Sequence, residues 1–147
     1  MMEKYFEEEG NKYYAGLKLD DCKPEVNFQA GVTPEKIEKA RNHYKIAETL
    51  KEEDKPLSTF PPQLDAKWRF FWAIGERPIE VADDIPKVIP RGFPEWEQRM
   101  NKWGEMMINA CMTAAEMAAI GMGLDKSTFT SRMQGGPHLL APTGSDL

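Results

Sequence analysis

The clearest hydrophobic pattern lies in the last third of the chain, where apolar residues recur at three- and four-residue steps from Pro94 to about Ile120. This is the period of one face of an α-helix. Polar residues occupy the opposite side, so the pattern predicts an amphipathic helix over about 94–120, ~40 Å long. Its apolar sector consists of Trp96, Met100, Trp103, Met107, Ala110, Cys111, Ala114, Met117 and Ala118.

The second half of this helix is apolar on most sides, because Met112, Ala115 and Ala119 lie off the main sector. We therefore expect it to be deeply buried. Its methionines could form an adaptable peptide-binding surface, but beside tryptophans and alanines core packing is favoured. The predicted centre of the core is Trp96, Trp103 and Met107.

The segment after this helix predicts a change of structure. Gly121-Met122-Gly123 suits a left-handed cap, and a short helix is expected over 127–133. The break at Gly135-Gly136-Pro137 then leads into 135–147, which is typical of the entry to a β-structure without strand partners after it. The residues that carry out the function are expected to be missing from the sequence or to belong to another chain.

A second helix is predicted from Thr33-Pro34. The Thr33 side chain can accept from the first free amides, and proline suits the first helical position. An apolar stripe of Ile37, Ala40, Tyr44 and Ala47 follows, and the helix is expected to end in the charged residues 51–54. Residues 1–32 are interrupted by glycine and proline, so no long element is predicted there.

The aromatic run at 67–75 lies in a segment that prolines break into short pieces. It fits a strand or a short buried helical turn, and periodicity does not decide between them. Core packing, at ~1.5–3 kcal/mol per buried ring, is favoured over a ligand cage or a base-stacking platform. Short strands are expected around 27–30, 68–74 and 138–141.

Composition narrows the classes of function. The length of 147 residues predicts a single region, 1–147. The net charge of −5 and the lack of a Lys/Arg cluster argue against nucleic acid as a binding partner. The longest apolar run, 117–124, is far short of the ~20 residues of a membrane span. The acidic N-terminus lacks a secretory signal, and Cys22 and Cys111 lack CxxC spacing. A cytoplasmic protein is predicted, with Cys111 a buried thiol.

No residue of the sequence is predicted to be catalytic, to bind a cofactor or to bind a metal ion. His43 and His138 are 95 residues apart; His43 is expected at the surface, and His138 in a structural hydrogen bond rather than facing a cavity. No HxD, HExxH, phosphate-loop, dinucleotide or GxSxG motif occurs. The acidic runs 7–9 and 52–54 are expected to be solvated.

The order of segments nevertheless resembles a known family. NFQAGVTPE at 27–35 and KWRFFWAIGERP at 67–78, followed by the helix from Phe93 and the tail from His138, resemble the N-terminal region of isopenicillin N synthase-like 2-oxoglutarate/Fe(II)-dependent oxygenases. The resemblance implies an α+β, mostly helical part with the first strands of a double-stranded β-helix (jelly-roll), whose core is absent. The helix would brace that core, with the entry at 135–147.

The same resemblance implies Fe(II) and 2-oxoglutarate for a full-length member. The family holds iron through an HxD pair and a distant histidine, and 2-oxoglutarate through the arginine of an RxS motif. All of these come after the last residue of this sequence, so no residue here inherits a role, and no cofactor is expected in this chain.

Three hypotheses follow. The chain is the N-terminal scaffold of such an oxygenase, completed by a missing C-terminal half. Alternatively, it is a non-catalytic structural or interaction subunit that docks to a larger assembly through its apolar helix face. The third is a small helical binding protein unrelated to the oxygenases.

Overall fold

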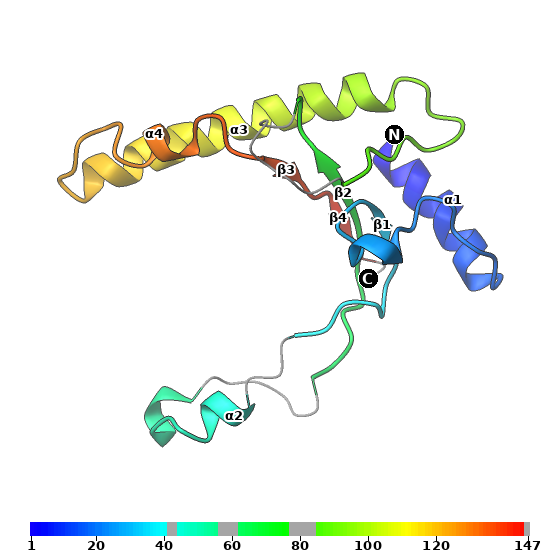
Figure 1. Cartoon of the computed structure of the whole chain (residues 1–147), viewed down its shortest axis with the longest axis horizontal. Coiled ribbons are helices and arrows are strands. Elements are labelled where there is room, and N and C mark those ends of the chain that lie inside the picture. Colours follow the sequence, from blue (N-terminus) through cyan, green and yellow to red (C-terminus); the bar gives the residue numbers. More distant parts are fainter. Residues whose placement is uncertain (41–43, 56–61, 77–84, 146–147) are drawn as a thin grey trace. The chain divides into compact units, whose positions relative to one another are not determined.

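The computed structural model describes residues 1–40, 44–55, 62–76 and 85–145. Within them the chain is a small α+β fold with an antiparallel sheet (Figure 1). The predicted α+β class is confirmed: in the described ranges the helices hold 13, 4, 26 and 4 residues and the strands 3, 6, 2 and 2. The helices are α1 (Met2–Tyr14), α2 (Tyr44–Ala47), α3 (Trp96–Gly121) and α4 (Thr130–Met133); the strands are β1 (Gly31–Thr33), β2 (Trp68–Ala73), β3 (Leu139–Leu140) and β4 (Thr143–Gly144). Short 3-10 helices span Pro24–Val26 and Glu52–Asp54.

The sheet is organised around β2. Its order is β1-β2-β3, and β4 pairs with β2 as well. The end of β2 pairs antiparallel with β3, Trp72 opposite Leu140, and its beginning pairs with β4, Trp68 opposite Gly144. Two compact units are formed, one of Met1–Leu19, Thr33–Arg69 and Thr143–Leu147, the other of Asp20–Val32 and Phe70–Pro142.

The first unit contains a helix that the sequence did not predict. α1 runs through Gly10, although glycine weakens a helix interior. Gly10 is buried, and a β-carbon there would lie 4.0 Å from the Trp68 ring. The rings of Phe6 and Tyr13 also pack on Trp68, with centroids 6.4 and 5.4 Å away. Tertiary packing on one aromatic ring therefore outweighs the local cost.

The helix predicted from Thr33 is wrong. Thr33 ends β1, and Lys36 has a left-handed backbone, φ 63°. The Lys36 amide donates to the Asp65 carbonyl at 2.8 Å, and the Asp65 amide donates to the Glu38 carbonyl at 2.8 Å. These bonds engage groups that a helix would have used. Among the described residues of the predicted span, Tyr44–Ala47 is α-helical and Glu52–Asp54 is a 3-10 helix. His43 lies outside the described residues.

The second unit brings β2 against α3. The aromatic run is a strand with alternating burial, so the core packing of Phe70 and Trp72 is confirmed. The rings of Phe70 and Trp96 meet edge to face with centroids 4.7 Å apart. β3 also contacts α3, and the predicted strand near 138–141 is confirmed.

Two residues of α3 that sequence reasoning did not single out hold β2 in place. The Asn101 Oδ1 accepts from the Trp72 Nε1 at 2.9 Å and from the Gly75 amide at 3.0 Å. Gly104 lies so close to Ile74 that an added β-carbon would stand 2.5 Å from its Cγ1.

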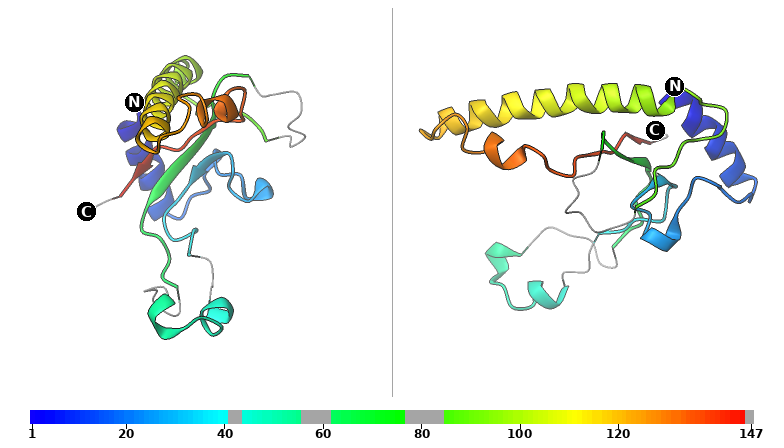
Figure 2. Two further views of the ribbon diagram at one scale, coloured as in Figure 1. Left: turned by 90° about the vertical axis from the view of Figure 1, so that its left-hand side faces the viewer. Right: turned by 45° about the horizontal axis from the view of Figure 1, so that its top comes forward.

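The predicted left-handed end of α3 is confirmed. Gly123 has φ +72°, its amide donates to the Ile120 carbonyl at 3.0 Å, and the Leu124 amide donates to the Ala119 carbonyl at 2.9 Å. This is the hydrogen-bond pair of a Schellman cap. The chain then turns back, so that α4 lies beside α3 (Figure 2). The following helix is shorter than predicted, because 127–129 form a turn.

The strand predicted around 27–30 is displaced to Gly31–Thr33. Asn27 and Phe28 both have left-handed backbones, φ 52° and 59°, which a strand does not allow. Gly31 is required where the strand begins, because a β-carbon there would stand 2.1 Å from the Asp21 carbonyl oxygen and φ is +66°.

Replacing Gly104 by alanine tests the close contact between α3 and Ile74. Gly104→Ala is expected to lower the free energy of unfolding by ~1–3 kcal/mol, because the whole Ile74 side chain must move. Gly121→Ala is the matched control, since nothing lies within 4 Å of its added β-carbon. It should raise stability by ~0.5–1 kcal/mol through helix propensity. Urea unfolding of the dilute protein measures both, and equal stabilisation would contradict the close approach.

Candidate interaction surface

α3 has two apolar faces, and the rest of the second unit uses one of them. The inner face follows steps of three or four residues along the whole helix, and its side chains are buried or half-buried. Each four-residue step turns the stripe by about 40° around the helix. The inner face consists of Trp96, Met100, Gly104, Ile108, Met112, Ala115 and Ala119.

The outer face is apolar and exposed in the described part of the chain. Trp103 and Met107 are 39% and 45% exposed, and Met106 and Met117 are 62% and 68% exposed. The predictions that Trp103 and Met107 centre the core and that the second half of α3 is deeply buried are therefore wrong. The outer face consists of Trp103, Met106, Met107, Ala110, Cys111, Ala114, Met117, Ala118 and Gly121, all exposed.

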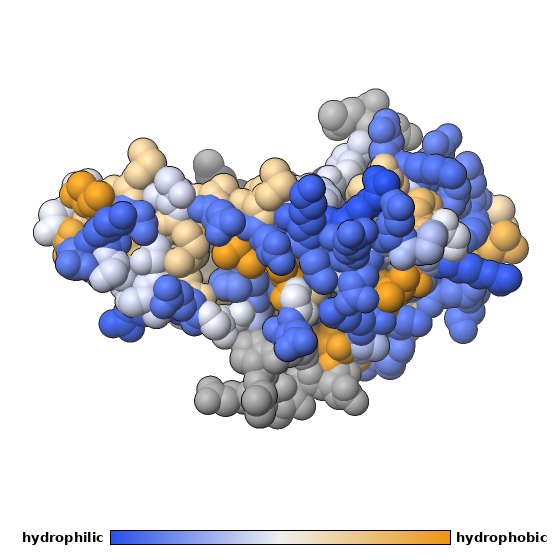
Figure 3. Space-filling model, turned by 90° about the horizontal axis from the view of Figure 1, so that it is seen from above, coloured by the Kyte–Doolittle hydropathy of each residue, from blue (hydrophilic) through white to orange (hydrophobic). Residues whose placement is uncertain are grey.

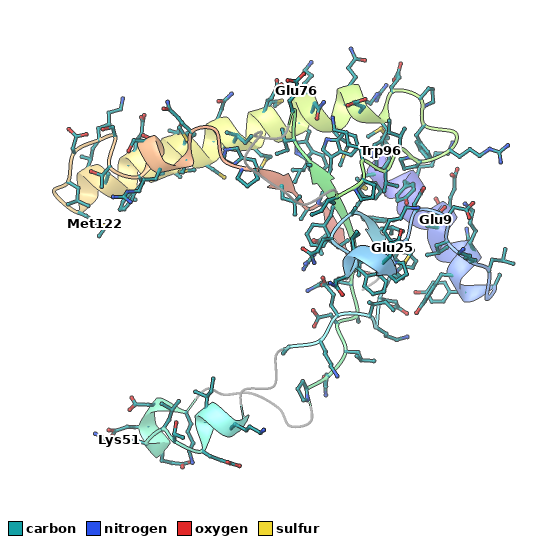
Figure 4. All side chains as sticks on the ribbon, viewed as in Figure 1. Glu9, Glu25, Lys51, Glu76, Trp96 and Met122 are labelled. Carbon is teal, nitrogen blue, oxygen red and sulfur yellow. The ribbon has the colours of Figure 1, made fainter. Side chains whose placement is uncertain are left out.

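The physical reason is that α3 is apolar around more of its circumference than its own neighbours cover. β3 and α4 contact one side of the helix, and the predicted apolar sector shares only Trp96 and Met100 with that side. Figure 4 shows Trp96 among the side chains near β2 and Met122 at the other end of α3. The sequence period revealed an apolar sector, but it did not reveal which sector meets the sheet.

The outer face carries no charge. Between positions 103 and 121 the only charged residues are Glu105 and Glu116, and both lie on the polar side of the helix. Beyond the face, Ile120, Met122 and Leu124 are also exposed at the C-terminal end. Figure 1 places the C-terminal half of α3 on the left. On the same side of Figure 3, orange and pale-orange residues reach the surface among blue ones.

The histidine and acidic residues weighed for chemistry do not converge. His138 is half-buried, and its backbone carbonyl accepts a hydrogen bond from the Ile74 amide at 3.1 Å. Within the described ranges, no group of three histidine, cysteine, aspartate or glutamate side chains is placed to hold a metal ion. Residues 52–54 are exposed as predicted, and so are Glu7 and Glu8. Glu9 is buried and paired with Lys12, so the predicted exposure is wrong for that residue.

The two cysteines occupy different surroundings. Cys111 is exposed on the outer face, so its predicted burial is wrong. Cys22 is half-buried beside Gly31, with which it forms a β-bridge. Burial raises the pKa of the Cys22 thiol, the Glu25 carboxylate raises it further, and the Lys23 ammonium opposes them.

Comparisons of the chain with protein-family models, with curated proteins and with solved structures find no match. None of the helices in the described residues is long and apolar enough to cross a bilayer. The oxygenase resemblance and the cytoplasmic location therefore stay predictions.

The cysteine environments predict different reaction rates. In the dilute native protein, Cys111 should react with a disulfide reagent well before Cys22, because the raised pKa lowers the thiolate fraction of Cys22 and its burial limits access. The single variants Cys22→Ser and Cys111→Ser assign the two phases. Equal rates in the native state, without urea, would contradict the structure.

Proposed function

We propose that this chain is a non-catalytic scaffold whose outer face docks on another polypeptide. One face of α3 holds the chain's own small sheet, and the other is offered to a partner. The observation that carries the proposal is the outer face itself, an uncharged apolar surface that runs along a 26-residue helix and is exposed.

The energetics support this use of the helix. Removing apolar surface from water contributes roughly 25 cal/mol per Å². Monomeric proteins rarely expose contiguous apolar patches larger than a few hundred Å², and larger patches usually mark interaction sites. Because the face lacks charged residues, a partner that covers it leaves no buried charge unpaired. The matching partner surface is therefore apolar.

Oxidative footprinting of the methionines tests the docking face. In the dilute chain, Met106 and Met117 should be oxidised quickly and Met100 slowly, because Met100 is buried against the sheet side of α3. Peptide mass spectrometry reads each site. Protection of Met106 and Met117 equal to that of Met100 in the dilute monomer would show that the chain covers its own face, and the proposal would fail.

A second candidate function is the N-terminal portion of an isopenicillin N synthase-like 2-oxoglutarate/Fe(II)-dependent oxygenase. It is favoured by the order of elements: β2 precedes α3, and the chain then returns through β3 and β4 to pair antiparallel with β2. In this proposal α3 braces a jelly-roll core that lies outside this sequence. That core would also supply the residues for Fe(II) and 2-oxoglutarate.

The oxygenase proposal predicts that the chain alone does not bind iron. An anaerobic Fe(II) titration followed by spectroscopy should show no stoichiometric complex, because the sequence holds neither an HxD pair nor an RxS motif. Tight stoichiometric binding would contradict it. The coding sequence offers a second check: an HxD pair, a distant histidine and an RxS motif in frame beyond codon 147 would support the proposal, and a stop codon there without them would remove it.

A further inference from the structure

We propose that the partner of the outer face is the outer face of a second copy of this chain, with the two α3 helices packed antiparallel about a two-fold axis near Met112. This inference rests on the docking function proposed above and names the occupant of that same face. It is carried by the spacing, the sizes and the charges of the exposed residues.

The spacing of the exposed residues fits another helix. Trp103, Met107, Ala110, Ala114, Met117 and Gly121 follow one another at steps of four, three, four, three and four residues. The alternation of four- and three-residue steps is that of the a and d positions along a two-helix seam. All six residues are exposed in the described structure. The occupant that this period predicts is therefore a helix.

The sizes of the residues are self-complementary in the antiparallel direction. A two-fold axis at Met112 places Trp103 of one copy opposite Gly121 of the other, and Met106 opposite Ala118. At the centre, Ala110 faces Ala114, which lets the two helices approach closely. Large side chains thus meet small ones at both ends, as a well-packed interface requires. Between the ends and the centre Met107 faces Met117, and these flexible side chains can adapt to each other.

A parallel pairing of the same faces packs less well. It would set Trp103 against Trp103 at one end and alanine against alanine in the middle, and the bulky end would hold the small residues apart.

The charge and the extent of the face agree with self-association. Because the face is uncharged, bringing two identical copies together creates no like-charge contact within the seam. A stable interface buries on the order of 800 Å² per partner. The outer face contributes to such an interface with four large side chains that are 39% to 68% exposed, Trp103, Met106, Met107 and Met117, and with the exposed alanines between them.

Sedimentation velocity of the full chain over a wide concentration range tests the dimer. The wild-type protein should show a monomer–dimer equilibrium. Ala114→Glu should raise the dissociation constant at least ~100-fold, because it buries one charge from each copy at the centre of the seam. Asn109→Glu adds the same charge at an exposed position on the polar side and should leave the constant within ~3-fold. Circular dichroism of the dilute variants verifies that both remain folded.

Disulfide trapping tests the direction of the helices. Ala110→Cys and Ala114→Cys are prepared separately in a background with Cys22→Ser and Cys111→Ser. Because Ala110 faces Ala114 in the antiparallel pairing, a mixture should form the mixed disulfide faster than either variant links to itself. Faster self-linking of each variant would overturn the antiparallel arrangement.

The outcomes separate this inference from the proposed function. A chain that stays monomeric at every concentration, with Met106 and Met117 still open to oxidation, overturns the second copy and leaves the docking face intact. A dimer that Ala114→Glu does not weaken also overturns the inference. Protection of the outer face in the dilute monomer overturns both proposals.

Discussion

The contact between β2 and α3 is the constraint on which the second unit depends. Asn101 ties the Trp72 indole and the Gly75 amide to the helix, and Gly104 admits Ile74 at a distance that no side chain would allow. Side chains alternate along a strand, so a slip of one residue would turn Trp72 away from Asn101 and expose the buried rings. These few contacts therefore define both the register of β2 and the side of α3 that faces it.

The packing of β2 on α3 also determines which residues of the helix remain exposed. With the sheet and α4 on the inner face, the outer face points away from the elements that α3 contacts. A 26-residue helix with two apolar faces exceeds what two short strands and a four-residue helix cover. The exposed methionines and alanines of α3 are thus the result of a specific interior contact, and they support the proposal that this face docks on a partner.

Errors of the sequence reading share one origin. Local sequence signals predicted a helix from Thr33, but Lys36 and Glu38 pair with Asp65 instead. The same signals predicted no helix through Gly10, but packing on Trp68 stabilises α1. Both outcomes depend on residues distant in the sequence. Glu9 is a similar case, because its position in an acidic run indicates solvent, whereas the folded helix buries it beside Lys12.

The sequence by itself determined the elements with a strong period or a strong local signal, the helix α3 and the left-handed cap at Gly123. It also predicted short strands near β2 and β3, although the period of the aromatic run left a helical turn open. Their causes lie within a few residues of one another, in side-chain alternation and backbone preference. Only the tertiary structure decided which face of α3 is buried. An apolar period shows which residues of a helix avoid water, but it does not show which of them contact the sheet. Asn101 and Gly104, a polar residue and a residue without a side chain, carried no hydrophobic signal, and they select the inner face and leave the outer one exposed.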